Sequence, residues 1–179
     1  MNRNKGASLT KGQGKSPTLV KSSQKGWTAL GNDEIFSSNV DLAFRELLRS
    51  AHVKLKAAST VEVMEAGRVP ASVVLTLTEW LNTHQKDMLE LLKISQSTFN
   101  RRRRSGGLRC DEADRVYRYM RLYILAANLF HGDAKSAREW LKEPAYAFKG
   151  KTPLQHAGTE LGAREVETLI GRIEHGIPS

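Results

Sequence analysis

The chain has 179 residues, a formal net charge of +9, 40% hydrophobic side chains and a single cysteine, Cys110. The hydrophobic content excludes wholesale disorder, and the lone cysteine excludes an intramolecular disulfide or a cysteine-cluster metal site. Because no stretch reaches the roughly 18 consecutive apolar residues of a membrane span, we expect a cytoplasmic chain whose positive charge favours polyanionic partners such as nucleic acid.

The amino-terminal segment, residues 1–26, contains six basic side chains and no acidic one. Gly, Ser, Thr and Gln fill most of the rest, so little apolar surface is available to offset chain entropy, and we expect a disordered tail. The segment also lacks the apolar core of a secretory signal. Two interpretations stay open: a basic arm that contacts phosphates without sequence preference, and an extension that only aids solubility.

From Asp41 onward the apolar spacing is helical, and the chain is predicted to be all-α. A first amphipathic segment has its apolar positions at Leu42, Leu47, Leu48 and Leu55.

A short helix is predicted over Thr60–Glu65, with Gly67 as its C-terminal cap. The next helix is predicted to hold Pro70 in its first turn, where the missing N–H is harmless. Its apolar face consists of Val73, Val74, Leu77 and Leu81.

The stretch from Gln85 to Arg104 has the pattern of a helix-turn-helix. Its first helix contributes Met88, Leu89 and Leu92, and a tight connection passes through Ile94-Ser95. Ser95 is expected to cap the second helix, and Phe99 is expected to anchor that helix in the core.

With Phe99 turned inward, Gln96, Ser97, Thr98 and Asn100 are free to face outward at the start of a recognition helix, where such side chains reach base edges or phosphates. The run Arg101-Arg102-Arg103-Arg104 follows directly. Four adjacent arginines sweep more than one helical turn, so they cannot all point at bases, and at least two should contact phosphates. The predicted DNA-binding set is Gln96, Ser97, Thr98, Asn100, Arg101, Arg103 and Arg104.

The alternative for this basic run is a solvated helix face. The segment also departs from the common helix-turn-helix pattern, because Lys93 stands where a turn glycine is usual and Arg102 occupies a position that is often apolar.

After a break at Gly106-Gly107, the longest periodic segment predicts a helix over residues 111–130. Tyr117 falls on its core stripe, whereas Tyr119 and Tyr123 are expected at the surface or in an interface. A helix-turn-helix monomer reads only a half-site, so we expect a homodimer on a roughly palindromic operator, with this long helix helping to form it.

Beyond Gly132, Asp133 is a good N-cap for a short helix ending at Leu141, and Pro144 and Gly150 mark a loop. A final helix is predicted over residues 163–175. Its apolar face consists of Val166, Leu169, Ile170 and Ile173. Because residues 133–179 are too few for a core of their own, they should pack on the long helix.

From about Val61 to its end, roughly two thirds of its length, the chain resembles the Xre/MbcA/ParS-type antitoxins. The resemblance rests on Ile94 to Arg104, on Lys149-Gly150-Lys151-Thr152-Pro153-Leu154, on Thr159-Glu160-Leu161-Gly162-Ala163, and on the closing run Gly171-Arg172-Ile173-Glu174-His175-Gly176-Ile177. It implies a partner toxin of the RES type, which consumes NAD, together with repression of the pair's own operon and self-association.

On this basis we expect a disordered tail over residues 1–26, a helical domain over 27–131 with the helix-turn-helix at about 83–104, and a toxin-binding domain over 132–179. The outward side of the last domain and the tail behind it are expected to cover the substrate entrance of the toxin. The predicted toxin-binding set is Lys151, Arg164, Arg172, Glu174, His175, Ile177 and Ser179.

No catalytic constellation is visible, so the chain is predicted not to be an enzyme and to bind no metal or cofactor. The five histidines show no metal-ligand spacing, and the glycine pairs lack the strand context of a phosphate-binding loop. The alternative to an antitoxin is a helix-turn-helix transcription regulator that has a dimerising C-terminal domain and no toxin partner.

Overall fold

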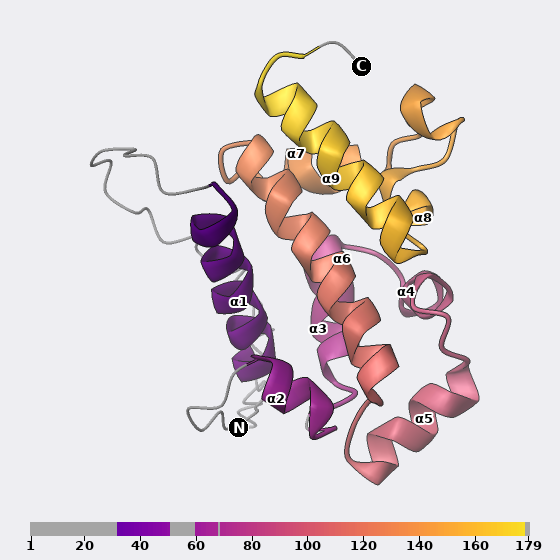
Figure 1. The fold of residues 1–179 in the computed structure, drawn as a ribbon. Helices are drawn as coiled ribbons and strands as arrows, with labels where there is room; N and C mark the ends of the chain where they lie inside the picture. Colours follow the sequence, from indigo (N-terminus) through magenta and orange to yellow (C-terminus); the bar gives the residue numbers. More distant parts are fainter. Residues whose placement is uncertain (1–31, 51–59, 68, 178–179) are drawn as a thin grey trace, which may run out of the picture.

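The computed structural model describes residues 32–50, 60–67 and 69–177, so the tail at 1–26, Leu55 and Ser179 lie outside the described residues. In the described part all regular structure is helical, which confirms the all-α prediction (Figure 1). The elements are α1 (Asn32–Ser50), α2 (Thr60–Glu65), α3 (Val73–Leu81), α4 (Gln85–Leu91), α5 (Gln96–Ser105), α6 (Cys110–Leu129), α7 (Ala134–Lys142), the 3-10 helix η1 (Tyr146–Phe148), α8 (Pro153–His156) and α9 (Glu160–Glu174).

Two expectations for the first helices need correction. Leu42 was placed on the apolar face of the first helix, but it is 65% exposed, whereas Leu47 and Leu48 are buried as predicted. Pro70 was placed inside a helical first turn, but α3 begins three residues later. The Val73 N–H donates to the Pro70 carbonyl at 3.1 Å, so Pro70 belongs to the turn that leads into the helix.

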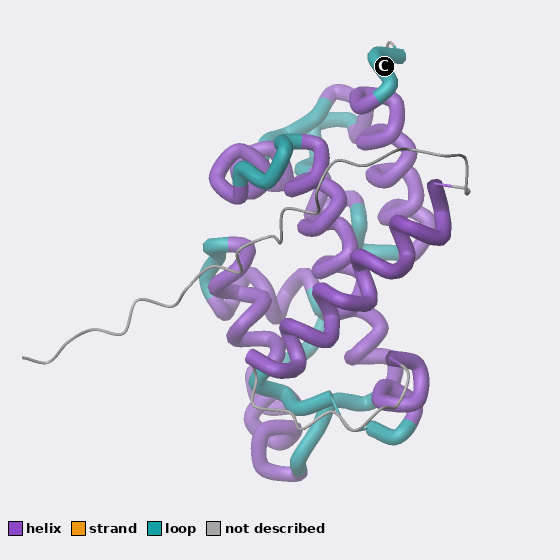
Figure 2. Tube along the Cα trace, turned by 90° about the vertical axis from the view of Figure 1, so that its left-hand side faces the viewer, coloured by secondary structure: helices purple, strands orange, loops and turns teal. Residues whose placement is uncertain are grey.

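Helix α6 lies at the centre of the bundle. It packs against α1, α2, α3, α7 and α9, and Figure 1 shows it running between α1 and α9. The view turned by 90° shows only helices and loops in the described residues (Figure 2). We expected this helix to help form a dimer, but its neighbours within the chain already cover most of its surface. Whether the chain forms a dimer, and through which surface, stays a prediction.

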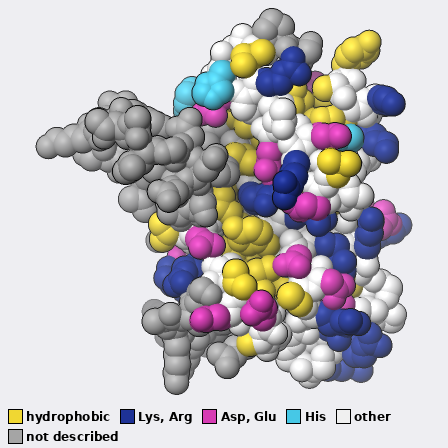
Figure 3. Space-filling model, in the orientation of Figure 1, with side chains coloured by type: hydrophobic (Ala, Val, Ile, Leu, Met, Phe, Trp, Pro, Cys, Tyr) yellow, Lys and Arg dark blue, Asp and Glu magenta, His cyan; other side chains and the backbone are white. Residues whose placement is uncertain are grey.

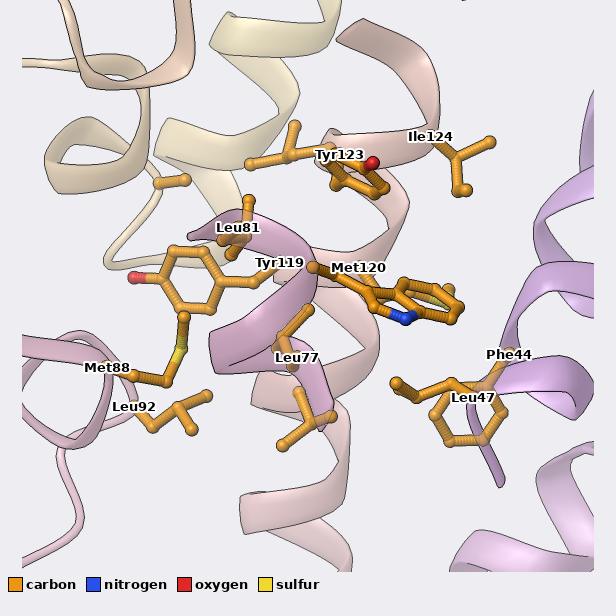
Figure 4. Close-up of a cluster of buried hydrophobic side chains, with 14 of the residues drawn as sticks. Phe44, Leu47, Leu77, Leu81, Met88, Leu92, Tyr119, Met120, Tyr123 and Ile124 are labelled. Atoms are coloured by element: carbon orange, nitrogen blue, oxygen red, sulfur yellow. The ribbon is translucent and has the colours of Figure 1, made fainter. Parts of the chain in front are cut away.

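The burial of α6 also corrects the assignment of its tyrosines. Tyr119 is completely buried and Tyr123 is 4% exposed, whereas Tyr117 is only half-buried (Figure 4). The Tyr119 hydroxyl donates to the Leu91 carbonyl at 3.1 Å, which joins α6 to the end of α4. Burial raises the pKa of Tyr119 to about 12, so this hydroxyl remains a donor at neutral pH.

One continuous hydrophobic core extends from Val40 to Ile170 and crosses the turn between α6 and α7. Hydrogen bonds also join α7 to the end of α3. Arg138 Nε donates to the Trp80 carbonyl at 2.7 Å, and Lys142 Nζ donates to the Asn82 carbonyl at 3.0 Å. Both cations lie on α7 and satisfy carbonyls at the C-terminal end of α3, where a helix lacks its own donors. The C-terminal region therefore supplies hydrogen-bond donors to the end of α3 and shares one core with the helices that precede it.

The last helices are partly as predicted. Asp133 caps α7 by accepting the Lys135 and Ser136 N–H groups, as expected. The final helix begins at Glu160 rather than near Ala163, because Thr159 caps it by accepting the Gly162 N–H at 3.1 Å. Ile173 was assigned to its apolar face but is 41% exposed.

Gly162 lets α8 and α9 approach each other closely. A Cβ added at this position would lie only 2.1 Å from the His156 carbonyl oxygen. A side chain of any size is therefore excluded where α9 crosses the end of α8.

Candidate functional site

Helices α4 and α5 form the helix-turn-helix that the sequence predicted. The connection passes through Lys93, whose φ of +53° is left-handed, which explains why glycine is usual at this position. Ser95 caps α5, since its Oγ accepts the Thr98 N–H at 3.2 Å. Phe99 is completely buried and is the only buried residue of α5. The other residues of this helix are exposed, except Thr98 and Arg102, which are half-buried.

The predicted base-reading side chains lie at the exposed start of α5. Gln96, Ser97 and Asn100 are exposed, while Thr98 is half-buried, and its hydroxyl accepts a hydrogen bond from Ser95 Oγ at 2.9 Å. Two amide contacts order this surface. Gln85 Nε2 donates to Gln96 Oε1 at 3.2 Å, and Gln96 Nε2 donates to Asn100 Oδ1 at 3.2 Å. The amide groups that face solvent are thus already oriented.

The run of four arginines divides into two kinds of residue. Arg101, Arg103 and Arg104 are exposed, but the Arg102 side chain is only 17% exposed and forms a bidentate ion pair with Glu112 at the start of α6. The distances are 2.7 Å from Nε to Oε2 and 3.1 Å from Nη2 to Oε1. The hydrogen bond that Arg102 donates to the Glu112 carboxylate raises the pKa of the Arg102 guanidinium.

Glu112 is 5% exposed and also accepts the Arg109 N–H at 2.8 Å, so it caps α6 while it holds α5. This contact explains the arginine at a position that is often apolar. The sequence offered no signal for it, because the two partners are separated by a turn.

The turn between α5 and α6 is constrained by its two glycines. Gly106 has a φ of +97° and ends α5, its N–H donating to the Arg102 carbonyl at 3.1 Å. A Cβ added at Gly107 would lie 2.5 Å from the Gly67 carbonyl oxygen, so this residue packs directly on the backbone between α2 and α3. The geometry fixes the angle at which α5 leaves the bundle.

The exposed face of α5 is strongly basic. Figure 3 shows Lys and Arg side chains gathered over this end of the molecule. A shallow hollow on the same face is lined by Ser97, Asn100, Arg101, Arg104 and Ser105. Amides, hydroxyls and guanidinium groups side by side form a surface that suits base edges and phosphates.

The predicted toxin-binding residues fall into two groups. Arg164 and Arg172 are exposed on α9, and Glu174, His175 and Ile177 are exposed at its C-terminal end or just beyond it. Lys151 is also exposed but lies in the loop between η1 and α8. Since α9 spans 15 residues, about 22 Å, its C-terminal end is well separated from its first turn. The remaining member of the set, Ser179, lies outside the described residues.

Ion pairs hold α9 on α6. Glu160 contacts Arg118 at 3.0 Å and Arg121 at 3.2 Å, and Arg121 also lies 2.6 Å from Glu167. Partial burial pushes the pKa of Glu160 upward, but the hydrogen bonds from Arg118 and Arg121 outweigh it and leave this pKa lowered. Burial raises the pKa of Glu167 despite its contact with Arg121. Arg164 Nε lies 3.5 Å from Glu160 Oε1, so one residue of the predicted toxin-binding set borders these ion pairs.

Three exposed apolar side chains in the C-terminal region were not predicted as site residues. They are Tyr146, which is fully exposed, Leu161 at 70% and Ile173 at 41%. Periodicity assigned Ile173 to the core, and no sequence signal marks the exposure of a single tyrosine in a loop.

The described residues contain no group of three or more His, Cys, Asp and Glu side chains that could hold a metal ion. In the same part of the chain, no helix is both long and apolar enough to cross a membrane.

A helix-turn-helix with a basic exposed face, joined to a helical C-terminal region, is the architecture of a helix-turn-helix protein with an added C-terminal module. Residues 62–121 match the antitoxin Xre-like helix-turn-helix domain, and residues 125–176 match the antitoxin Xre/MbcA/ParS C-terminal toxin-binding domain. Together the two matches cover most of the chain. The chain therefore belongs to the Xre family of antitoxins.

Curated relatives agree with this assignment. The chain is 36% identical over 112 residues to an antitoxin Xre of Photorhabdus laumondii, covering 62% of this chain and 76% of the relative. It is 34% identical over 99 residues to an antitoxin Xre of Yersinia enterocolitica, covering 55% of this chain and 67% of the relative.

Proposed function

We propose that the chain neutralises a RES-type toxin, an NAD-degrading enzyme, by direct binding, and that it represses its own operon by binding operator DNA. The observation that carries this proposal is the capped, basic and exposed helix α5 on the same chain as the matched toxin-binding region. The C-terminal end of α9 lies at the opposite end of the bundle from α5 (Figure 1). Such a separation would let the two partners bind at once.

In this proposal α5 enters the major groove of the operator. Gln96, Ser97, Thr98 and Asn100 contact base edges or nearby phosphates from the start of the helix. Arg101, Arg103 and Arg104 neutralise phosphates and supply affinity without sequence information. Arg102 instead holds α5 on α6 through Glu112.

The toxin is proposed to meet the exposed face and the C-terminal end of α9. Arg164, Arg172, Glu174, His175 and Ile177, with Ser179 beyond them, would cover the substrate entrance, and Lys151 would add a contact from the neighbouring loop. Neutralisation would then need no catalysis and no cofactor, because a bound chain excludes NAD from the toxin. We further propose that the chain acts in the cytoplasm as a homodimer on a roughly palindromic operator.

Two single variants separate the two activities. We would co-express the full-length chain with the protein encoded next to its own gene, and measure growth rescue together with binding to the DNA upstream of the gene pair. We expect Arg103→Ala to weaken DNA binding and to keep rescue, and we expect Ile177→Ala to weaken rescue and to keep DNA binding.

Point variants suit this test better than removal of α7 to α9. That truncation would also remove Arg138 and Lys142 from the end of α3 and would expose α6. The proposed function is wrong if the neighbouring protein is harmless when expressed alone. It is also wrong if Arg103→Ala leaves DNA binding unchanged and Ile177→Ala leaves growth rescue unchanged.

A further inference from the structure

Among the described residues, Tyr146 is the most exposed large apolar side chain, with a relative exposure of 101%. It is part of η1, in the loop that joins α7 to α8. Exposure alone carries little information, since much of a protein surface is apolar. What distinguishes Tyr146 is the backbone beneath it.

The loop under Tyr146 is closed by its own hydrogen bonds. The Ala145 N–H donates to the Lys151 carbonyl at 3.0 Å, and the Lys151 N–H donates to the Phe148 carbonyl at 3.1 Å. The Phe148 and Gly150 N–H groups both donate to the Ala145 carbonyl, each at 3.1 Å. These bonds fix the backbone from Ala145 to Lys151, so little conformational entropy is left to lose on binding.

A buried aromatic ring attaches the same loop to the bundle. Phe148 is 4% exposed and stacks on the His156 ring, with centroids 4.3 Å apart and planes inclined by 14°. His156 in turn contacts the Glu165 carboxylate on α9. The loop therefore turns one aromatic residue inward as a support and leaves Tyr146 outward on a fixed backbone.

We propose that Tyr146 is an anchor residue for the toxin, in addition to the end of α9. Tyrosine is enriched among residues that dominate binding energy, because its rigid ring contributes a large contact area and its hydroxyl a hydrogen bond. The residue lies inside the matched toxin-binding domain, residues 125–176, which commits the surface to that partner. Exposed Lys149 and Lys151 follow it in the same loop, so the matching site on the toxin is an apolar pocket with carboxylates nearby.

This inference rests on the proposed toxin partnership, and its test separates the two. The binding constant of the purified protein encoded by the neighbouring gene is measured against the full-length chain and its variants by calorimetry. We expect Tyr146→Ala to weaken binding at least tenfold and Tyr146→Phe to weaken it less than threefold. The matched control is Leu42→Ala, which removes another exposed apolar side chain outside the matched domain and should leave binding unchanged.

Because the Tyr146 side chain is fully exposed, the alanine variant should unfold at the same temperature as the parent chain. Binding that stays within twofold in Tyr146→Ala but falls in Ile177→Ala would overturn this inference and leave the proposed function intact. If the parent chain does not bind the neighbouring protein, the proposed function and this inference are both wrong.

Discussion

Helices α5 and α9 carry the two proposed binding surfaces and attach to the same central helix in different ways. Helix α5 buries only Phe99 and depends on the Arg102–Glu112 ion pair to hold its second half. Helix α9 buries Gly162, Ala163, Val166, Leu169 and Ile170, and adds ion pairs at its margin. A basic surface leaves few positions for apolar anchors, so a charged contact adds to Phe99 and the turn glycines in placing α5, whereas α9 is placed mainly by packing.

The largest effect is expected where packing is tightest. Gly162→Ala would bring a methyl group within 2.1 Å of the His156 carbonyl oxygen, so we expect the free energy of unfolding to fall by about 3 kcal/mol in chemical denaturation. Gly171→Ala is the control on the same helix, because nothing lies within 4 Å of its added Cβ. It should raise stability by up to about 1 kcal/mol. Equal effects of the two substitutions would contradict the claim that packing places α9.

An intermediate effect is expected at the ion pair that holds α5. Glu112→Gln removes the carboxylate that receives Arg102 and the Arg109 N–H, so we expect a loss of about 2 kcal/mol in the free energy of unfolding. Operator affinity should fall as well, although every arginine is still present. Glu90→Gln on α4, an exposed position, serves as the control and should change neither quantity. Full operator affinity in Glu112→Gln would show that the ion pair does not position α5.

The smallest effect is expected in the turn that precedes α5. Lys93 adopts a φ of +53°, so Lys93→Gly should relieve left-handed strain and raise the melting temperature through a gain of about 0.5–1 kcal/mol. Asn82→Gly, at a φ of +49°, should gain less because asparagine tolerates this conformation. A loss of stability in Lys93→Gly would mean that the lysine side chain has a contact that outweighs the strain.

The sequence predicted most of the helices because their signals are local. Ser95 and Asp133 cap the helices that they were expected to cap, and the glycine pair breaks the chain where it should. The errors concern what covers a helix. Periodicity placed Ile173 in the core and Tyr119 at the surface, although neighbours distant in sequence decide both positions. An amphipathic pattern gives the face of a helix but does not identify the helix packed against it.

In the candidate site, too, local features could be predicted from the sequence and contacts between helices could not. The exposed amides and arginines of α5 follow from Phe99 turning inward, and their contacts with DNA remain a prediction. The pairing of Arg102 with Glu112 requires the angle between α5 and α6, which the sequence pattern did not reveal. Likewise, the sequence pattern does not reveal that Tyr146 lies on a loop closed by its own hydrogen bonds.

The central claim, that the arginine run divides into phosphate-binding residues and one positioning residue, is tested most directly by the salt dependence of operator binding. Affinity would be measured over a range of salt concentrations for the parent chain, Arg103→Ala and Arg102→Ala. We predict that Arg103→Ala lowers the slope of log affinity against log salt by about 0.9, because one phosphate contact is lost. Arg102→Ala should weaken binding with the slope unchanged. Equal reductions of slope in the two variants would show that Arg102 also contacts phosphate and would contradict the division.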